Sequence, residues 1–170
     1  SDNTIIIFMG DNGFLMGEHG LEGKWYGYEE SIRVPLFIYD PALPDRIRNS
    51  RARQIALNID IAPTILSMAG VPVPARMQGK DLIAVVEGKI PARKDFFYQH
   101  YFLGSPGIPR EEGVVTKDFK YMIYIEHQYE ELYDIAHDPH ETTNLARDAS
   151  YKHKLEELRK RCKELKRLVN

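Results

Sequence analysis

A short apolar strand that ends in a glycine-rich turn constrains the fold of this chain more than any other feature of its sequence. Residues 5–9 read Ile-Ile-Ile-Phe-Met, and Gly-Asp-Asn-Gly follows at once at residues 10–13. Five β-compatible apolar residues closed by glycine and Asx residues predict a buried strand. Because the run does not alternate with polar residues, we expect it in a parallel sheet covered on both faces. Ligands of open α/β sheets bind at the carboxyl ends of such strands, which makes residues 10–13 a candidate site.

The loop beyond this strand carries four candidate site residues. Six glycines within residues 10–27 predict a backbone folded tightly, often around a ligand. Asp11 and Asn12 offer a carboxylate and an amide oxygen, the ligands that Ca²⁺ and Mg²⁺ prefer, although Asp-Asn-Gly is also a common turn sequence. Lys24 could neutralise a tetrahedral oxyanion and His19 could donate a proton to it, or both could be ordinary loop residues. Two oxygen ligands are too few for such a cation, so a complete metal site needs others from elsewhere.

The composition is that of a globular protein and argues against several other classes. The chain has 170 residues, 43% hydrophobic and 28% charged, which suffices for a domain with a real core and is unlike disorder. A net charge of −2 gives no reason to expect nucleic acid or an anionic membrane as a partner. No apolar run approaches the roughly 20 residues of a membrane helix. The single cysteine, Cys162, excludes an internal disulfide and a cysteine-based zinc site.

The first half of the chain predicts further α/β elements. Residues 34–39 predict a second strand. Residues 58–68 have the apolar spacing of a helix, with Asp60 placed to cap it and Pro63 in its first turn. Residues 80–87 predict a short helix.

The second half predicts an antiparallel sheet followed by a helix. Short aromatic strands with tight connections are expected at residues 95–102, 113–116, 120–125 and 131–134. Residues 151–168 predict an amphipathic helix packed on that sheet. Its apolar stripe comprises Leu155, Leu158, Cys162, Leu165 and Leu168. The Arg and Lys residues at 159–167 are interpreted as the solvated face of this helix.

The order of several short motifs resembles the C-terminal half of a type I sulfatase. The motifs are GDNG, GEHG, GK, YEESIRVPLFIYDP, NIDIAPTILSMAGVPVP, MQGKDL, KYMIY and EELYDIAHDPHETTNLA. Each is weak alone, but their order and spacing together are specific, and they cover residues 2–151. Sulfatases belong to the alkaline phosphatase superfamily. The resemblance implies an α/β fold in which residues 1–90 supply part of the catalytic sheet and residues 91–170 form a small antiparallel subdomain with a C-terminal helix.

The resemblance also implies roles for the loop residues. Asp11 and Asn12 match two ligands of the single active-site calcium, and Lys24 matches the lysine that contacts the sulfate group. His19 lies in the matching loop and is retained as a candidate catalytic residue. The implied partner is a sulfated small molecule or a sulfated glycan, and the family is typically periplasmic or secreted, or lysosomal in animals.

The chain departs from the family in one respect that matters for chemistry. The nucleophile of a sulfatase is a formylglycine made from the Cys or Ser of a Cys/Ser-x-Pro-x-Arg motif, and no such motif occurs here. The aspartate pair that completes the calcium site is also absent. We therefore expect a fragment with more chain upstream, inactive by itself, whose truncated sheet could self-associate.

Two alternatives stay open on the sequence alone. One is a phosphatase or phosphonate monoester hydrolase of the same superfamily, in which a metal pair and a lysine are arranged similarly. The other is a catalytically silent glycan-binding or interaction module built from the antiparallel sheet and the last helix.

Overall fold

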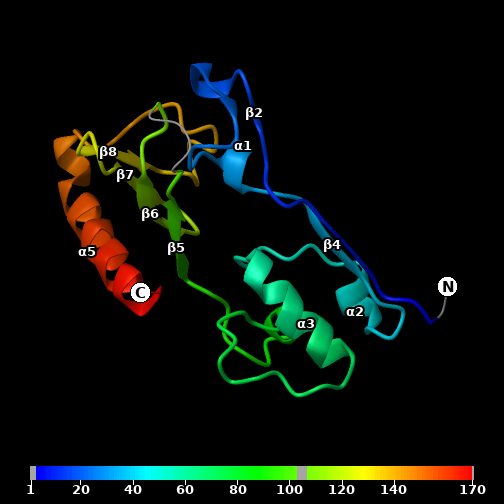
Figure 1. Cartoon of the computed structure of the whole chain (residues 1–170). Coiled ribbons are helices and arrows are strands. Elements are labelled where there is room, and N and C mark those ends of the chain that lie inside the picture. The colour runs from blue at the N-terminus through cyan, green and yellow to red at the C-terminus, as the bar shows by residue number, and fades with distance from the viewer. Residues whose placement is uncertain (1–2, 103–106, 170) are drawn as a thin grey trace. The chain divides into compact units, whose positions relative to one another are not determined.

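The chain folds into two compact units, each assembled from two separate stretches of sequence. The structure is a computed structural model that describes residues 3–102 and 107–169 (Figure 1). The first unit comprises Ser1–Asp11 and Pro35–Lys94, and the second comprises Asn12–Val34 and Asp95–Asn170. The loop after the first strand therefore belongs with the C-terminal half of the chain. The division into family domains at residue 90 stays a prediction.

The two strands of the first unit form an antiparallel ribbon. Strand β1 (Ile6–Met9) pairs with β4 (Leu36–Tyr39), with Met9 opposite Leu36. Phe8 is 59% exposed, so the prediction of a buried strand in a parallel sheet is wrong for these residues. The apolar run predicts a strand, but it encodes neither the direction of the partner nor what covers the faces. Self-association through this ribbon stays a prediction.

The helices of the first unit agree with the expected pattern. Helix η2 (Asn58–Asp60) leads directly into α3 (Ile61–Met68), which confirms the helix predicted at residues 58–68. Pro63 lies in the first turn of α3, where a missing N–H costs nothing. Helix α4 (Leu82–Val86) confirms the short helix at residues 80–87, and α2 (Asp45–Arg48) is a single turn.

Asp60 lies at the start of α3, as predicted, but its carboxylate does not cap this helix. The side chain is fully buried and accepts no hydrogen bond from the first turn of α3. Arg93 donates to both carboxylate oxygens, at 2.8 and 2.9 Å. The backbone N–H groups of Leu57 and Lys80 donate to the same oxygens, each at 2.8 Å. Asp60 thus joins three segments of the first unit through one buried carboxylate.

The second unit contains the predicted antiparallel sheet. Strands β5 (Asp95–His100), β6 (Glu111–Thr116), β7 (Lys120–Tyr124) and β8 (Tyr129–Tyr133) follow one another in chain order, each antiparallel to the last. Helix α5 (Lys152–Val169) runs across one face of this sheet (Figure 1). Four strands and the helix are confirmed, with bounds that differ from the predicted ones by a few residues.

The core of the second unit lies between the sheet and α5. Its fully buried members are Val114, Tyr121, Leu132, Leu155, Leu158 and Cys162. The helical part of this set matches the predicted apolar stripe, whereas Leu168 is 72% exposed and lies outside the core. Burial raises the pKa of the Cys162 thiol to about 11, so this residue packs as a small hydrophobic side chain.

The buried pair of the first unit generates a stability prediction. Arg93→Met leaves the Asp60 carboxylate buried without its cation, so we expect the free energy of unfolding to fall by about 3–5 kcal/mol. Urea unfolding of the chain measures this. Arg48→Met is the matched control, because Arg48 pairs with Asp45 at the surface and its loss should cost less than about 1 kcal/mol. Equal losses in the two variants would contradict a structural role for the buried pair.

Candidate functional site

A small hairpin opens the second unit. Strand β2 (Leu15–Met16) pairs antiparallel with β3 (Glu22–Gly23), and the 3₁₀ turn η1 (Glu18–Gly20) forms the tip. Helix α1 (Glu29–Ile32) follows. The hairpin places the residue after β3, Lys24, beside the residues that precede β2.

Lys24 and Asn12 meet at the base of this hairpin. The Lys24 Nζ donates to the Asn12 Oδ1 at 3.2 Å. The Asn12 Nδ2 donates to the carbonyl of Gly13 at 2.7 Å, which leaves the amide oxygen as the group that faces a cation. The structure therefore brings together two of the four predicted site residues, with a lysine ammonium held against an oxygen ligand.

Gly13 fixes the start of the hairpin against α1. Its N–H donates to the carbonyl of Ser31 at 2.8 Å. A Cβ at this position would lie 2.0 Å from the carbonyl oxygen of Glu30, so only glycine allows the two backbones to approach this closely. The Asp-Asn-Gly sequence is thus more than a turn signal, because the glycine holds Asn12 at a defined place.

Asp11 is the last residue of the first unit, and Asn12 is the first residue of the second. The side chain of Asp11 is exposed, and its carbonyl accepts a hydrogen bond from the Asn58 Nδ2 at 3.1 Å. A carboxylate and an amide oxygen are a donor set that suits Ca²⁺, which takes 6–8 oxygen ligands, so two donors form only part of a site. The metal-binding role of Asp11 and Asn12 stays a prediction.

His19 contacts a different set of residues from Lys24. It occupies the tip of the hairpin with a φ of 56°, a left-handed conformation that is uncommon for a non-glycine residue. Its ring stacks on Tyr28, with centroids 3.8 Å apart, and its Nε2 lies 3.5 Å from the Glu30 Oε2. These contacts hold the tip of the hairpin against α1. A catalytic role for His19 stays a prediction.

A buried lysine of the antiparallel sheet anchors the segment that follows Lys24. Lys120, at the start of β7, is fully buried, and its Nζ donates to the carbonyl of Gly27 at 2.9 Å. The same Nζ forms ion pairs with the Glu29 Oε1 at 2.9 Å and the Glu141 Oε1 at 2.7 Å. The Glu141 Oε2 in turn accepts from the Glu29 N–H at 2.7 Å. Sequence reasoning missed this centre, and its only signal was a lysine at the start of the otherwise apolar run KYMIY.

A second buried carboxylate holds the same segment. The Glu111 Oε2 accepts from the Gly27 N–H at 2.9 Å, and Glu111 is fully buried. Burial, with the nearby charge of Glu131 adding to it, raises the pKa of Glu111 to about 8. Glu131 accepts from the hydroxyls of Tyr28 and Tyr124, each at 3.1 Å. Residues 27–28 and the antiparallel sheet are therefore joined through hydrogen bonds between buried groups.

Among the described residues, one further group has the geometry to hold a metal ion. His19, Glu30 and Glu141 each place a ligand atom within 4.8 Å of the others. The Lys120 ammonium already lies 2.7 Å from the Glu141 carboxylate and supplies the positive charge there. We therefore interpret the group as part of the buried ionic centre.

The anchoring role of Lys120 can be tested by removing its charge. Lys120→Met leaves the Glu29 and Glu141 carboxylates uncompensated, so we expect a loss of about 3–5 kcal/mol in the free energy of unfolding. We also expect faster hydrogen exchange at the amides of Gly27 and Glu29. Lys117→Met, in the exposed turn before β7, is the control and should change neither. Unchanged exchange at Gly27 and Glu29 in Lys120→Met would disprove the anchor.

The raised pKa of Glu111 predicts a pH dependence of stability. The ordinary pKa of 4.5 applies to the unfolded chain, whereas the folded chain holds the proton up to about pH 8. The folded state therefore binds more protons between these values, and stability should fall as pH rises from about 4.5 to 8, by at most about 1.4 kcal/mol per pH unit.

Glu111→Gln removes this titration and is the test. Urea unfolding from pH 5 to 8 should give a flatter profile in the variant, with a gain in stability over the original chain near pH 8. Some slope should remain, because burial also raises the pKa of Glu131. Identical pH slopes in the two chains would show that Glu111 does not titrate in this range.

Comparison with known sequences identifies relatives of one kind. Residues 17–168 match the family described as N-sulphoglucosamine sulphohydrolase, C-terminal. The chain is 41% identical over 164 residues to an N-acetylglucosamine-6-O-sulfatase of Bacteroides thetaiotaomicron, covering 92% of the chain and 29% of that protein. It is 34% identical over 107 residues to an extracellular sulfatase homolog of Drosophila melanogaster, covering 62% of the chain and 9% of that protein.

Solved structures agree in fold. One protein in complex with its substrate D-glucosamine-2-N,6-O-disulfate matches with a TM-score of 0.87 and 36% identity, covering 98% of the chain and 34% of that protein. A 2-O GAG sulfatase matches with a TM-score of 0.83 and 27% identity, covering 96% of the chain and 36% of that protein. The phosphonate monoester hydrolase of Agrobacterium radiobacter matches with a TM-score of 0.82 and 28% identity, covering 98% of the chain and 36% of that protein. These similarities confirm the α/β fold with an antiparallel subdomain and a C-terminal helix.

Two observations bear on location and extent. The relatives include extracellular sulfatases, and within the described residues no helix is long and apolar enough to cross a membrane. The chain spans only part of the length of these relatives, from 9% of the Drosophila protein to 29% and 34% of two others.

Proposed function

Because the chain belongs to the sulfatases, in the family defined by the C-terminal region of N-sulphoglucosamine sulphohydrolase, we propose that it is the C-terminal part of an enzyme that hydrolyses a sulfate monoester. The observation that carries the proposal is the 3.2 Å contact between the Lys24 ammonium and the Asn12 amide oxygen. It joins the proposed sulfate-binding cation to a proposed metal ligand within one anchored loop.

Lys24 binds an oxygen of the sulfate group in this proposal. A lysine ammonium is a compact charge that stabilises negative charge on the sulfate oxygens as the ester bond breaks. Lys24 follows β3 directly, and the segment after it is held at Gly27 by Lys120 and Glu111. The ammonium is therefore supplied by a loop that is positioned before substrate arrives, which is the arrangement that favours catalysis.

Asp11 and Asn12 contribute two ligands of a calcium ion. Their oxygen donors suit a hard cation, and the orientation of the Asn12 amide leaves its Oδ1 as the ligand atom. Calcium, when bound, supplies a charge that polarises the sulfate group. The remaining ligands come from outside the 170 residues.

The nucleophile is a formylglycine that another part of the enzyme provides. The chain has no Cys/Ser-x-Pro-x-Arg sequence from which it could be made. The 170 residues by themselves should therefore hydrolyse no sulfate ester, and measurable turnover of an aryl sulfate by this chain alone would contradict that expectation.

The substrate class follows from the relatives. One is named an N-acetylglucosamine-6-O-sulfatase, and a solved neighbour holds D-glucosamine-2-N,6-O-disulfate. We propose that the enzyme acts on 6-O-sulfated glucosamine, as a free sugar or within a glycan, and that it is exported like its extracellular relatives.

The role of Lys24 is tested in the enzyme that contains this chain. Lys24→Ala should lower kcat/KM for 6-O-sulfated glucosamine by about 10²–10³-fold, the cost of removing one group that stabilises charge in a transition state. Lys117→Ala, an exposed lysine of the second unit, is the control and should leave turnover unchanged. Full activity in Lys24→Ala would overturn the assignment.

Two other functions predict different outcomes. The similarity to a phosphonate monoester hydrolase favours an enzyme that hydrolyses phosphate or phosphonate esters faster than sulfate esters, and kcat/KM for paired aryl esters decides this. A non-catalytic glycan-binding module would bind its glycan unchanged after Asp11→Ala and Lys24→Ala.

A further inference from the structure

Helix α5 concentrates the positive charge of the chain. Its residues, Lys152–Val169, include eight Lys or Arg and three Glu, a net charge of +5. The whole chain carries −2, so all other residues together carry −7. A basic element in an otherwise acidic chain is typical of a surface that meets a polyanion.

Part of this charge serves the packing of α5 on the sheet. The cations that face strand carboxylates are Arg159 with Glu130, Arg161 with Asp95 and Lys166 with Glu112. The Arg161 guanidinium binds Asp95 through two nitrogens, at 2.7 and 3.0 Å. These pairs fix the helix, so their charge is already compensated.

Three cations of α5 take no part in these pairs. Lys160, Lys163 and Arg167 are exposed, and none forms an ion pair with a carboxylate of the described residues. They are three and four residues apart, so they share one face and extend over about 10 Å of the helix axis. Glu156 and Glu164 lie four residues on either side of Lys160, whereas Lys163 and Arg167 repel each other at this spacing, and an anionic ligand would relieve that repulsion.

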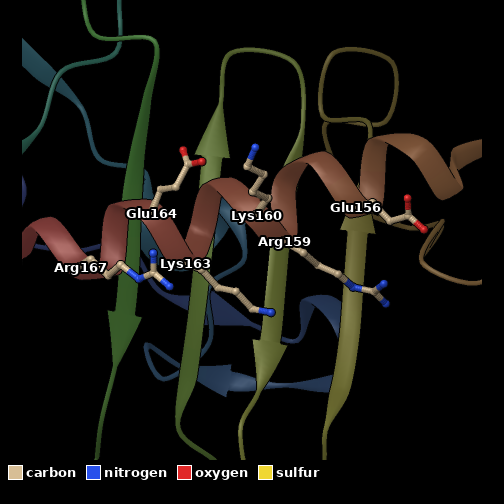
Figure 2. Close-up of a pocket in the computed structure, with 6 residues that line it drawn as sticks. All are labelled: Glu156, Arg159, Lys160, Lys163, Glu164 and Arg167. Carbon is tan, nitrogen blue, oxygen red and sulfur yellow. The ribbon is translucent and has the colours of Figure 1, made fainter.

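These cations line a depression on the surface of the second unit. Its other lining residues are Glu156, Arg159 and Glu164. Figure 2 shows Arg159, Lys163 and Arg167 extending to one side of α5 and Lys160 and Glu164 extending to the other, with the strands behind the helix. Lysine heads act as point charges and a guanidinium binds two oxygens of an anion at once, so the group suits several sulfate groups held along a line.

We propose that the outer face of α5 binds a sulfated glycan chain through Lys160, Lys163 and Arg167. The inference rests on the proposed function, which makes a sulfated sugar the substrate, and extends it from one sulfate ester to the polymer that carries it. Charge complementarity selects this occupant, because sulfate groups stay ionised at all physiological pH values and the lining cations outnumber the carboxylates.

The test measures binding of heparin to the full 170-residue chain. The triple variant Lys160→Gln, Lys163→Gln, Arg167→Gln should bind about 10-fold more weakly than the original chain, from three surface ion pairs of ordinary strength. The difference should shrink as salt rises, because exposed charges are screened. Arg51→Gln, Arg53→Gln, Arg76→Gln is the matched control, since it removes the same charge from exposed positions of the first unit and should bind like the original chain.

Two results would overturn the proposal. Equal weakening in both triple variants would show that only net charge matters, and tighter binding of a DNA duplex than of heparin through the same three residues would assign the face to nucleic acid. Desulfated heparin should bind none of the three chains measurably.

Failure of this proposal is separable from failure of the proposed function. Hydrolysis of a small aryl sulfate by the enzyme that contains this chain tests the function, and the α5 variant should leave that rate unchanged. Active enzyme with unaltered heparin binding in the α5 variant refutes the glycan surface alone. Selective loss of heparin binding without sulfatase activity refutes the proposed function alone.

Discussion

The loop that carries the candidate site is held in place by a buried lysine. Lys120 is fully buried at the start of β7, and its ammonium binds the carbonyl of Gly27 and the carboxylates of Glu29 and Glu141. A buried charge is tolerated only when it is paired, and here the ammonium donates to one carbonyl and lies within ion-pair distance of two carboxylates. The antiparallel sheet therefore anchors residues 27–29 through Lys120.

This anchor explains why the segment at residues 12–34 belongs with the C-terminal half of the chain. Gly13 is held to Ser31, and Gly27 is held to both Glu111 and Lys120. Lys24 lies between these fixed points and meets Asn12. The antiparallel sheet comes late in the sequence and was predicted as a separate subdomain. Through Gly27 it nevertheless positions Lys24, the proposed sulfate-binding cation. The raised pKa of Glu111 is a consequence of the same burial.

The cations of helix α5 fall into two groups, those that contact the strands and those that face outward. The cations that reach the strands are paired with carboxylates, whereas Lys160, Lys163 and Arg167 face outward without ion-pair partners among the described residues. Glu156 and Glu164 lie four residues from Lys160, so the outer face carries both signs of charge, with cations in excess. The proposed glycan surface and the proposed sulfatase activity concern the same chemical group, a sulfate ester on a sugar.

Much of this architecture could be read from residue order. Periodicity predicted α3, α4, α5 and the four strands of the antiparallel sheet, because burial of one face imposes a regular spacing. The series of motifs from residues 2–151 predicted the family, which the match over residues 17–168 confirms. Asp11, Asn12, His19 and Lys24 were selected as site residues, and the contact of Lys24 with Asn12 is what the structure adds.

The sequence by itself determined α3, α4, α5 and the longer strands, the family and the residues that carry the proposed chemistry, since these depend on local pattern and on the order of motifs. Only the tertiary structure decided that β1 pairs antiparallel with β4, that His19 stacks on Tyr28, and that Lys120 anchors the loop. Those outcomes depend on which distant groups meet when water is excluded. The pairing of Lys120 with Glu141 joins residues whose separation along the chain carries no local signal.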